Sequence, residues 1–446
     1  IEMTSLLRLY KNYKMNNILD AVKKVHFVGI GGIGISAIAR LMHLKGTKVS
    51  GSDISHSIIT VELEKVGVPI TIGHRSENIP EKTDLVIYTI AVSDDNPELV
   101  FARENNIRTL TYPQTLSIIS EDLETIAISG THGKTTTTAM LAKVCIDAGL
   151  DPTVIVGSLM KDLQSNLCVG RSKYFIVEAC EYRRSFLNLN PTILVITNID
   201  ADHLDYYEDM HDIQLAFREL ALKVPFHGAV ICNATDPLLE PILSGLICPI
   251  IDYTKYMDTD LKLNAPGIHN TSNAAAVGAV ADILNLDKKN TQQSLENFTG
   301  TWRRFDLHGT TKRGALIYDD YAHHPKEIKA TLAGLKEKYP GKKRIAFFQP
   351  HQFSRTKLLL QEFSEAFSDV DLIYIFPIYP AREVSDLSIN SSMLVGKIKE
   401  NGKDAHLVES FEVGAEIMNS QNDSSVVITM GAGDVYKVTE MISYNA

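Results

Sequence analysis

Two stretches of the chain share one order of elements: an apolar strand, a glycine-rich turn and an amphipathic helix. In the first stretch, residues 25–30 form the apolar strand and the glycines fall between positions 29 and 34. In the second, the strand covers residues 125–129, the glycines are Gly130 and Gly133, and a helix is predicted over 134–148. Repeated alternation of strand and helix indicates an α/β fold with doubly wound parallel sheets.

The alternation continues to the end of the chain and divides it into three consecutive α/β units. Further apolar strands are predicted at residues 47–50, 84–89, 173–177, 192–197, 315–318, 344–348, 371–375 and 426–429. A length of 446 residues suits two to four domains. The predicted boundaries are 21–120, 121–306 and 307–446, and residues 1–20 are an extension of unknown role.

Composition narrows the class of protein. Charged residues make up 22% of the chain, the balance of a soluble globular protein. A net charge of −10 disfavours a nucleic-acid-binding protein, which usually presents a basic face. No apolar run reaches the roughly 18 residues that cross a bilayer, and no cleavable leader is recognisable, so we expect a cytoplasmic protein without membrane insertion. The five cysteines form no Cys-x-x-Cys pair, which disfavours a disulfide framework or a zinc site.

The first glycine loop fits the GxGxxG pattern of nucleotide diphosphate sites. It runs from Gly29 to Gly34, between the predicted strand and the helix, and Asp53 follows about 20 residues later at the end of the next strand. Glycines let the backbone approach a pyrophosphate, and the helix N-terminus supplies N–H donors. The pyrophosphates of NAD and of a UDP-sugar look alike to such a loop. Taken alone, this loop favours a dehydrogenase.

The second glycine loop changes the expected class of enzyme. It resembles a P-loop, although Ile128 stands where the first glycine of GxxxxGK[ST] would be. Lys134 can reach the terminal phosphates of a nucleoside triphosphate, and the hydroxyl of Thr135 can bind Mg²⁺. A dehydrogenase needs no triphosphate site. The second loop therefore favours an ATP-using enzyme.

Candidate metal ligands follow this loop. Glu178 comes directly after the strand 173–177, where a P-loop enzyme usually places an acid, and Mg²⁺ prefers such hard oxygen ligands. A polar cluster at residues 197–205 follows another buried strand and includes His203, a candidate ligand of a second metal ion. The alternatives are a solvated acid at a strand end and a structural histidine.

Several motifs together resemble the Mur ligases. Residues 130–136 are similar to the ATP loop of that family, and residues 25–32 are similar to the opening of the member that joins L-alanine to UDP-N-acetylmuramic acid. Further similar stretches occur in the family's order at residues 198–207, 267–275, 302–305, 319–325, 348–356 and 429–434. The resemblance extends over about residues 24–440.

This resemblance implies an architecture, a reaction and a set of ligands. The three domains would bind UDP, ATP and the amino acid in that order along the chain. ATP would phosphorylate the muramate carboxylate, and the amine of L-alanine would then displace phosphate from the acyl phosphate, a step of peptidoglycan precursor synthesis. Two Mg²⁺ ions, for which Mn²⁺ is a substitute, would assist. The partners would be UDP-N-acetylmuramic acid and L-alanine, with no nucleic acid, and the protein would be a monomer or a homodimer.

The resemblance also implies roles for individual residues. The ATP-binding residues would be Gly130, Thr131, His132, Gly133, Lys134, Thr135, Thr136, His269, Asn273, Arg304 and Asp320. The residues facing the UDP group would be Gly31, Gly32, Ile33, Gly34, Asp53 and His74. The metal ligands would be Thr135, Glu178 and His203. The substrate carboxylates would meet His323, His351 and Arg355. The catalytic residues would be Lys134, His203 and Arg355. For the polar side chains of this set, an ordinary cap or surface contact is the alternative.

The chain departs from the family pattern at a few positions. The family's Glu-Ala-Asp-Glu-Ser-Asp run is here Glu-Ala-Cys-Glu-Tyr-Arg, so that Cys180 replaces an acid and Arg183 reverses a charge. An acyl-phosphate mechanism needs no thiol, and we expect Cys180 to serve packing. Gln352 stands where an arginine is common, which should weaken a carboxylate contact by about 1–2 kcal/mol. Ala322 replaces a frequent glycine.

Three alternatives remain open at this stage. A ligase that adds a recycled tripeptide to the same UDP-sugar is the nearest. An NAD-dependent dehydrogenase rests on the first glycine loop alone. A non-catalytic nucleotide-binding regulator is disfavoured because Lys134, Thr135, Glu178 and His203 are all present.

Overall fold

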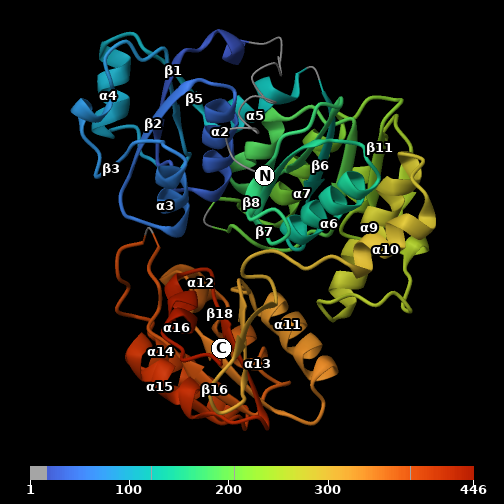
Figure 1. Cartoon of the computed structure of the whole chain (residues 1–446). Coiled ribbons are helices and arrows are strands. Elements are labelled where there is room, and N and C mark those ends of the chain that lie inside the picture. Colours follow the sequence, from blue (N-terminus) through green and yellow to red (C-terminus); the bar gives the residue numbers. More distant parts are fainter. Residues whose placement is uncertain (1–17, 122, 205, 382, 446) are drawn as a thin grey trace. The chain divides into compact units, whose positions relative to one another are not determined.

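The computed structural model describes residues 18–121, 123–204, 206–381 and 383–445. They form two compact units (Figure 1). The first contains the residues up to 258 together with 272–298, and the second contains 259–271 together with 299–446. Most of the 1–20 extension lies outside the described residues; its end enters the short helix η1 (Ile18–Ala21).

The first unit begins with a five-stranded parallel sheet. Its strand order is β3 (Ile70–Ile72), β2 (Lys48–Asp53), β1 (Lys24–Val28), β4 (Leu85–Tyr88) and β5 (Arg108–Thr111). The connecting helices are α2 (Ile33–Leu44), α3 (Ile58–Lys65), α4 (Pro97–Glu104) and α5 (Tyr112–Ser120). The chain leaves β1 toward β2 on one side and later returns to β4 on the other, so the first glycine loop lies at a switch point of the sheet, where ligands bind in such folds.

A seven-stranded sheet follows in the same unit. Its strand order is β12 (Ile250–Asp252), β11 (Ala229–Cys232), β10 (Ile193–Ile196), β6 (Glu124–Ser129), β9 (Tyr174–Glu178), β7 (Thr153–Met160) and β8 (Ser165–Cys168). Its main helices are α6 (Lys134–Asp147), α7 (Met210–Ala221), α10 (Lys288–Glu296) and α9 (Ile268–Ile283), of which residues 272–283 belong to this unit. Strands β10 and β9 flank β6 in parallel, so the polar residues after all three strands gather at one edge.

The two sheets of the first unit share one hydrophobic core. Buried side chains of α2 and of the β7–β8 pair belong to the same apolar cluster. A polar contact crosses it: the fully buried side-chain amide of Asn166 donates to the Ser36 hydroxyl at 3.0 Å and to the Ile33 carbonyl. Because a buried amide needs partners, this contact ties β8 to the first turn of α2.

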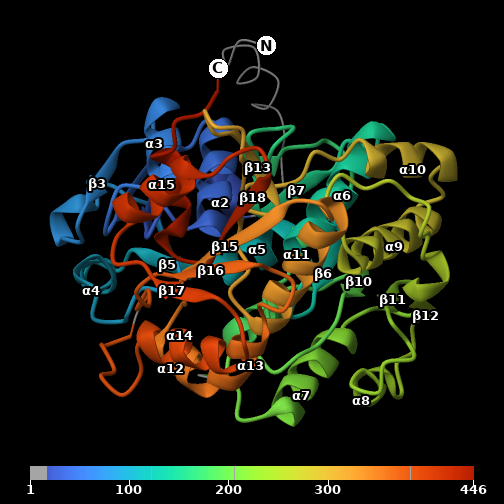
Figure 2. The same ribbon diagram turned by 90° about the horizontal axis from the view of Figure 1, so that it is seen from below.

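The second unit contains a six-stranded sheet between two helical layers (Figure 2). Its strand order is β13 (Asp306–Thr310), β14 (Leu316–Asp320), β18 (Ser425–Met430), β15 (Lys343–Phe348), β16 (Leu372–Ile375) and β17 (Ala405–Leu407). Helices α11 (Pro325–Lys338) and α14 (Ser391–Glu400) cover one face, and α15 (Phe411–Ser420) covers the other. Phe347 and Phe348 are neighbours in β15 and enter opposite cores, as a strand buried on both faces requires.

The α/β fold class predicted from the sequence is confirmed, with two differences in detail. Strand β1 ends at Val28 rather than residue 30, because Gly29 takes a left-handed φ of 77° and turns the chain. The β7–β8 and β13–β14 pairs are antiparallel, which the sequence pattern did not predict. In the described part of the chain, no helix combines the length and apolarity needed to cross a membrane.

Candidate active site

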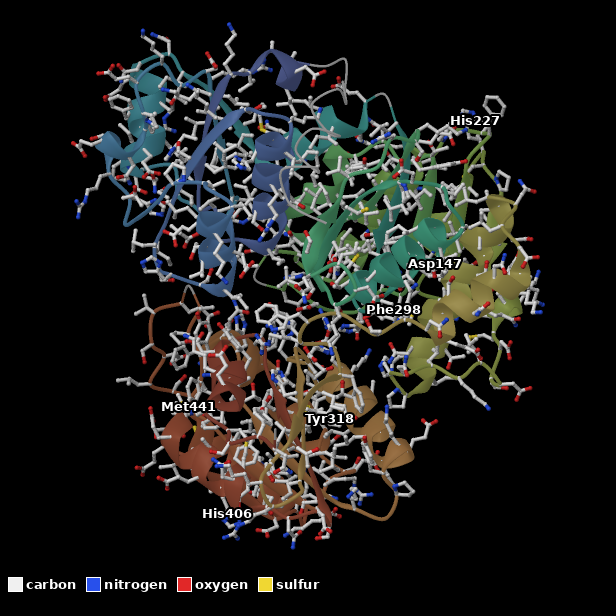
Figure 3. The ribbon with its side chains drawn as sticks, viewed as in Figure 1. Asp147, His227, Phe298, Tyr318, His406 and Met441 are labelled. Atoms are coloured by element: carbon white, nitrogen blue, oxygen red, sulfur yellow. The ribbon has the colours of Figure 1, made fainter. Side chains whose placement is uncertain are left out.

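The second glycine loop joins β6 to α6, whose last residue, Asp147, is labelled in Figure 3. Gly130 has a φ of 126° and Gly133 a φ of 84°, both in the region that favours glycine. A methyl group at Gly130 would lie 2.1 Å from the Thr197 hydroxyl oxygen, and one at Gly133 would lie 2.4 Å from Oδ1 of Asn273. Both glycines are therefore required by backbone conformation and by close packing.

Hydrogen bonds from the segment after β10 hold this loop in place. The Asn198 side chain pairs with the His132 backbone in both directions, at 3.0 Å each, and the Thr131 backbone N–H donates to the Asn198 carbonyl. The Thr131 hydroxyl accepts from the Asp200 backbone N–H at 2.8 Å. The polar cluster predicted at residues 197–205 thus forms the wall of the loop; Asp205 lies outside the described residues.

Lys134 is the first residue of α6 and is nearly buried. Its ammonium donates to the carbonyls of Gly130 and Thr131 at 2.5 and 3.0 Å and lies 2.8 Å from Oε2 of Glu181. Burial acts to lower the pKa of Lys134, but the nearby acidic groups, Glu181 foremost, outweigh it and hold this pKa above its ordinary value. Lys134 therefore stays cationic at any physiological pH, directly beside the loop.

Two oxygen donors stand next to Lys134. The Thr135 hydroxyl donates to Oε1 of Glu178 at 3.1 Å, and Oε2 of Glu178 accepts from the Gly157 backbone N–H at 2.8 Å. A methyl group at Gly157 would lie 2.3 Å from that carboxylate, so the neighbouring strand must present a glycine there. A hydroxyl and a carboxylate at this separation fit the hard, oxygen-rich coordination of Mg²⁺.

His203 lies on the far side of Glu181, with its Nε2 3.8 Å from Oε1 of that acid. Its ring packs against Tyr182 with centroids 4.8 Å apart, and its backbone has a φ of 56°, uncommon outside glycine. Arg183 and Arg184 share this left-handed conformation. Such backbone outliers gather where a site fixes side chains in set directions.

The Cys180 side chain is exposed, so the expectation that it serves packing is wrong. Partial desolvation by the surrounding site and the Glu181 carboxylate raise the pKa of its thiol. The thiol therefore stays protonated near neutral pH, and it offers no thiolate nucleophile.

The first glycine loop is held by an acid as well. Oδ2 of Asp53 accepts from the Gly31 backbone N–H at 2.7 Å. A methyl group at Gly34 would lie 2.7 Å from the Tyr112 ring, which packs on the first turn of α2. Gly32 and Ile33 begin that helix, whose N-terminus is an anion site in principle. His74 follows β3 and bonds to Ser52, the neighbour of Asp53.

The second unit brings a separate set of predicted residues together. Asp320 ends β14 and is buried; it accepts from the backbone N–H groups of Phe305 and Ala322 at 2.7 and 2.8 Å. Burial raises the pKa of Asp320 to about 6, although Arg304 opposes the shift. The Arg304 guanidinium lies over the Tyr321 ring, 5.0 Å from its centroid.

The residues predicted to meet carboxylates also cluster in the second unit. The rings of His323 and His351 are 5.9 Å apart, and Nη1 of Arg355 lies 3.3 Å from Nδ1 of His351. Gln352 lies between them in sequence with a φ of 73°, and its backbone N–H donates to the Tyr379 carbonyl at 2.8 Å. One cation and two imidazoles thus share a small region at the carboxyl ends of β14 and β15.

The remaining predicted residues lie on α9. Asn273 belongs to the first unit, and its side-chain amide occupies the space next to Gly133. His269 lies in the stretch assigned to the second unit, and burial lowers the pKa of its imidazole to about 4, so it is neutral at pH 7.

Two acids of the site were not predicted from the sequence: Glu181, which pairs with Lys134, and Glu98, which bonds to Ser52. Glu181 could have been recognised from the sequence, because it is an acid three residues after Glu178. No motif or neighbouring residue in the sequence distinguishes Glu98 from other acids.

These features define a class, namely α/β proteins that bind nucleotides at glycine loops between strand and helix. Family models of three domains match the chain: "Mur ligase family, catalytic domain" at residues 24–123, "Mur ligase middle domain" at 128–257 and "Mur ligase, glutamate ligase domain" at 303–433. The chain belongs to the Mur ligase family.

Three relatives with the same named activity match nearly the whole chain. The chain is 42% identical to the UDP-N-acetylmuramate–L-alanine ligase of Clostridium kluyveri, over 94% of this chain and 97% of that protein. It is 43% identical to the protein of the same name from Acetivibrio thermocellus, over 95% and 97%. The crystal structure of the UDP-N-acetylmuramate–alanine ligase of Thermotoga maritima matches with a TM-score of 0.79 and 30% identity, over 94% and 97% of the two chains.

Proposed function

We propose that this protein is the ATP-dependent ligase that joins UDP-N-acetylmuramic acid to L-alanine, with release of ADP and phosphate, in peptidoglycan precursor synthesis. The observation that supports the proposal most directly is the assembly of Lys134, Thr135 and Glu178 around one glycine loop, in a chain 42% identical to a ligase of that name. Residues 21–120 would bind the UDP group, 121–306 ATP and 307–446 the amino acid.

The triphosphate would lie along the loop of residues 130–136. Lys134 is held cationic next to the loop carbonyls, so it can neutralise charge on the transferring γ-phosphoryl group. The muramate carboxylate attacks phosphorus and ADP leaves. The amine of alanine then attacks the acyl carbon, loses its proton, and phosphate leaves. The chain's task is positioning and charge neutralisation.

Mg²⁺ would supply charge neutralisation and a template for the phosphate oxygens. Thr135 and Glu178 would hold one ion, because their oxygens are already 3.1 Å apart and the Glu178 carboxylate is oriented by the Gly157 N–H. His203 would hold a second ion, with Glu181 beside it. His323, His351 and Arg355 would meet the substrate carboxylates, Asn273 and His269 the adenosine region, and Arg304 and Asp320 the ATP phosphates and ribose.

One assay tests the function. The protein is mixed with ATP, Mg²⁺ and UDP-N-acetylmuramic acid, and phosphate release is followed with and without L-alanine. Release that depends on L-alanine is expected. Release with the tripeptide L-alanyl-γ-D-glutamyl-meso-diaminopimelate but not with L-alanine would instead identify the recycling ligase, and no release with either amine would refute the proposal. A change in NADH absorbance would point to a dehydrogenase.

Substitutions at Lys134 test the assignment of the phosphate site. Lys134→Met should lower phosphate release by at least about 100-fold, the usual scale for one electrostatic group in transition-state stabilisation. That variant leaves Glu181 as an unpaired buried acid, so the matched control is Lys134→Met with Glu181→Gln, which restores neutrality. A folded double variant with wild-type rates would refute the role given to Lys134.

A further inference from the structure

Glu98 is a completely buried acid at the carboxyl end of the first sheet. It lies in the first turn of α4, where its backbone N–H donates to the Asn96 side chain, and its exposed fraction is 0%. Among the described residues no lysine or arginine side chain pairs with it. A carboxylate without water or a cationic partner must be stabilised by hydrogen-bond donors.

Side chains from the strands β1 and β2 and from the short helix η2 (Ser76–Asn78) supply that stabilisation. The Ser52 hydroxyl donates to Oε2 at 2.6 Å, and the Asn78 amide donates to Oε1 at 2.5 Å. Nε2 of the buried His26 lies 3.8 Å from Oε2. Burial acts to raise the pKa of Glu98, but the nearby His26 ring and the hydrogen bonds from Ser52 and Asn78 outweigh it and hold this pKa below its ordinary value.

The same carboxylate reaches His74. Nδ1 of His74 lies 3.1 Å from the Ser52 hydroxyl and 3.4 Å from Oε2 of Glu98. The other ring nitrogen, Nε2, has no hydrogen bond to any described residue, and the side chain is 15% exposed. Ser52 is followed by Asp53, which bonds to the glycine loop. Ser52 and Glu98 therefore hold the His74 ring close to the first glycine loop, with Nε2 left without a partner among the described residues.

A carboxylate can only accept hydrogen bonds, so Nδ1 of His74 must carry its proton toward Glu98. We propose that Glu98 is a positioning residue for the UDP group: it fixes the ring orientation and the Nδ1–H form of His74, so that Nε2 meets the nucleotide. This inference rests on the proposed function only in taking the first domain as the UDP site. Glu98 itself is fully buried and does not touch the ligand.

Substitution of Glu98 by glutamine keeps the shape and removes the charge. Glu98→Gln should raise the KM for UDP-N-acetylmuramic acid and the Kd for UDP about tenfold, with kcat and the KM for ATP within twofold of wild type. His74→Asn should do the same. Because Glu98 acts through His74, the double variant should again show about tenfold rather than a hundredfold. Asp84→Asn is the matched control, since Asp84 bonds to backbone N–H groups at the opposite end of this sheet.

Nitrogen-15 spectra of the histidines provide a readout that a merely structural role would not move. Wild-type His74 should show the proton on Nδ1, and Glu98→Gln should shift it toward the Nε2–H form. Ser52→Ala loosens His74 without removing the charge, and it should raise the Kd for UDP severalfold even if Glu98→Gln does not fold.

The outcomes separate this inference from the proposed function. Unchanged UDP affinity in folded Glu98→Gln or Ser52→Ala, or a multiplicative double variant, would overturn the positioning role. Wild-type protein that binds UDP but releases no alanine-dependent phosphate would overturn the proposed function instead, and the effect of Glu98→Gln on UDP binding would still be measurable.

Discussion

Among single residues, Asp320 is an acid whose surroundings favour its neutral, protonated form. Its folded-state pKa, about 6, lies above the usual value near 4 because the carboxyl is buried. The stability that follows from this shift is fully present below pH 4 and is lost as pH rises through 6. The loss amounts to about 2–3 kcal/mol.

This predicts a pH-dependent difference between two proteins. Relative to wild type, Asp320→Ala should gain about 2–3 kcal/mol in the free energy of unfolding between pH 4 and pH 7, because the variant lacks the acid that is costly to ionise. Urea unfolding at several pH values measures the difference. Thr331→Val removes one donor to Asp320 but no titrating group, so it should keep the wild-type slope. A difference independent of pH would contradict the prediction.

Gln352 lies in the domain that we propose binds the amino acid. It neighbours His351 and lies close in sequence to Arg355, and it carries no charge where the family commonly has an arginine. Gln352→Arg should therefore lower the KM for L-alanine by up to about tenfold, since a charge-assisted hydrogen bond adds about 1–2 kcal/mol. Initial rates of phosphate release measure this. Gln352→Glu, of similar size and opposite sign, should raise the KM; equal effects of both variants would show that charge at this position is unimportant.

At the scale of elements, two separable reasons require glycine in the loop before α6: a positive φ and the lack of space for a side chain. Gly130 and Gly149 both have positive φ, but a methyl group at Gly130 would overlap Thr197 whereas one at Gly149 meets nothing within 4 Å. Gly149→Ala should cost only the conformational term of about 1–2 kcal/mol and retain activity.

Gly130→Ala should cost more than this and abolish ATP-dependent phosphate release, because the segment holding the loop must move. Urea unfolding and phosphate release measure both variants. Equal losses of stability and of activity in the two would mean that φ alone, and not the close approach of Thr197, requires glycine in the loop.

The elements that the sequence predicted well are those with long apolar runs between clear turns. Strands β9 and β10 are of this kind, and Glu178, expected directly after a strand, is the last residue of β9. Strand β8 has the mixed sequence Ser-Asn-Leu-Cys and no periodicity, and its Asn166 bonds to Ser36, 130 residues away. Local pattern contains no information about such a partner.

The same reasoning separates the parts of the candidate site. Lys134 and Thr135 are adjacent within one motif, so their neighbourhood could be predicted from sequence. Glu98 could not, because Ser52 lies in β2 while His74 and Asn78 follow β3, and these residues come together only through the strand order of the sheet. Glu181 lies between these cases: it was visible near Glu178, but its ion pair with Lys134 depends on the turn that follows β9.

At the scale of the whole molecule, the division into two compact units predicts two unfolding transitions in calorimetry. Phe347 lies in the core of the second unit. Phe347→Ala should therefore lower the free energy of unfolding of that unit alone, by about 3–5 kcal/mol, and the transition that shifts to lower temperature identifies the second unit.

UDP then distinguishes the units by mass action. If the first sheet holds the UDP group, UDP at a hundred times its Kd should stabilise the first unit by about 2.7 kcal/mol and raise the transition that Phe347→Ala leaves unchanged. The two sheets of that unit share one core and the Asn166–Ser36 contact, so they should move together as a single transition. A UDP-dependent shift of the transition assigned by Phe347→Ala, with the other unmoved, would place the UDP site in the second unit and refute the assignment of residues 21–120 to UDP.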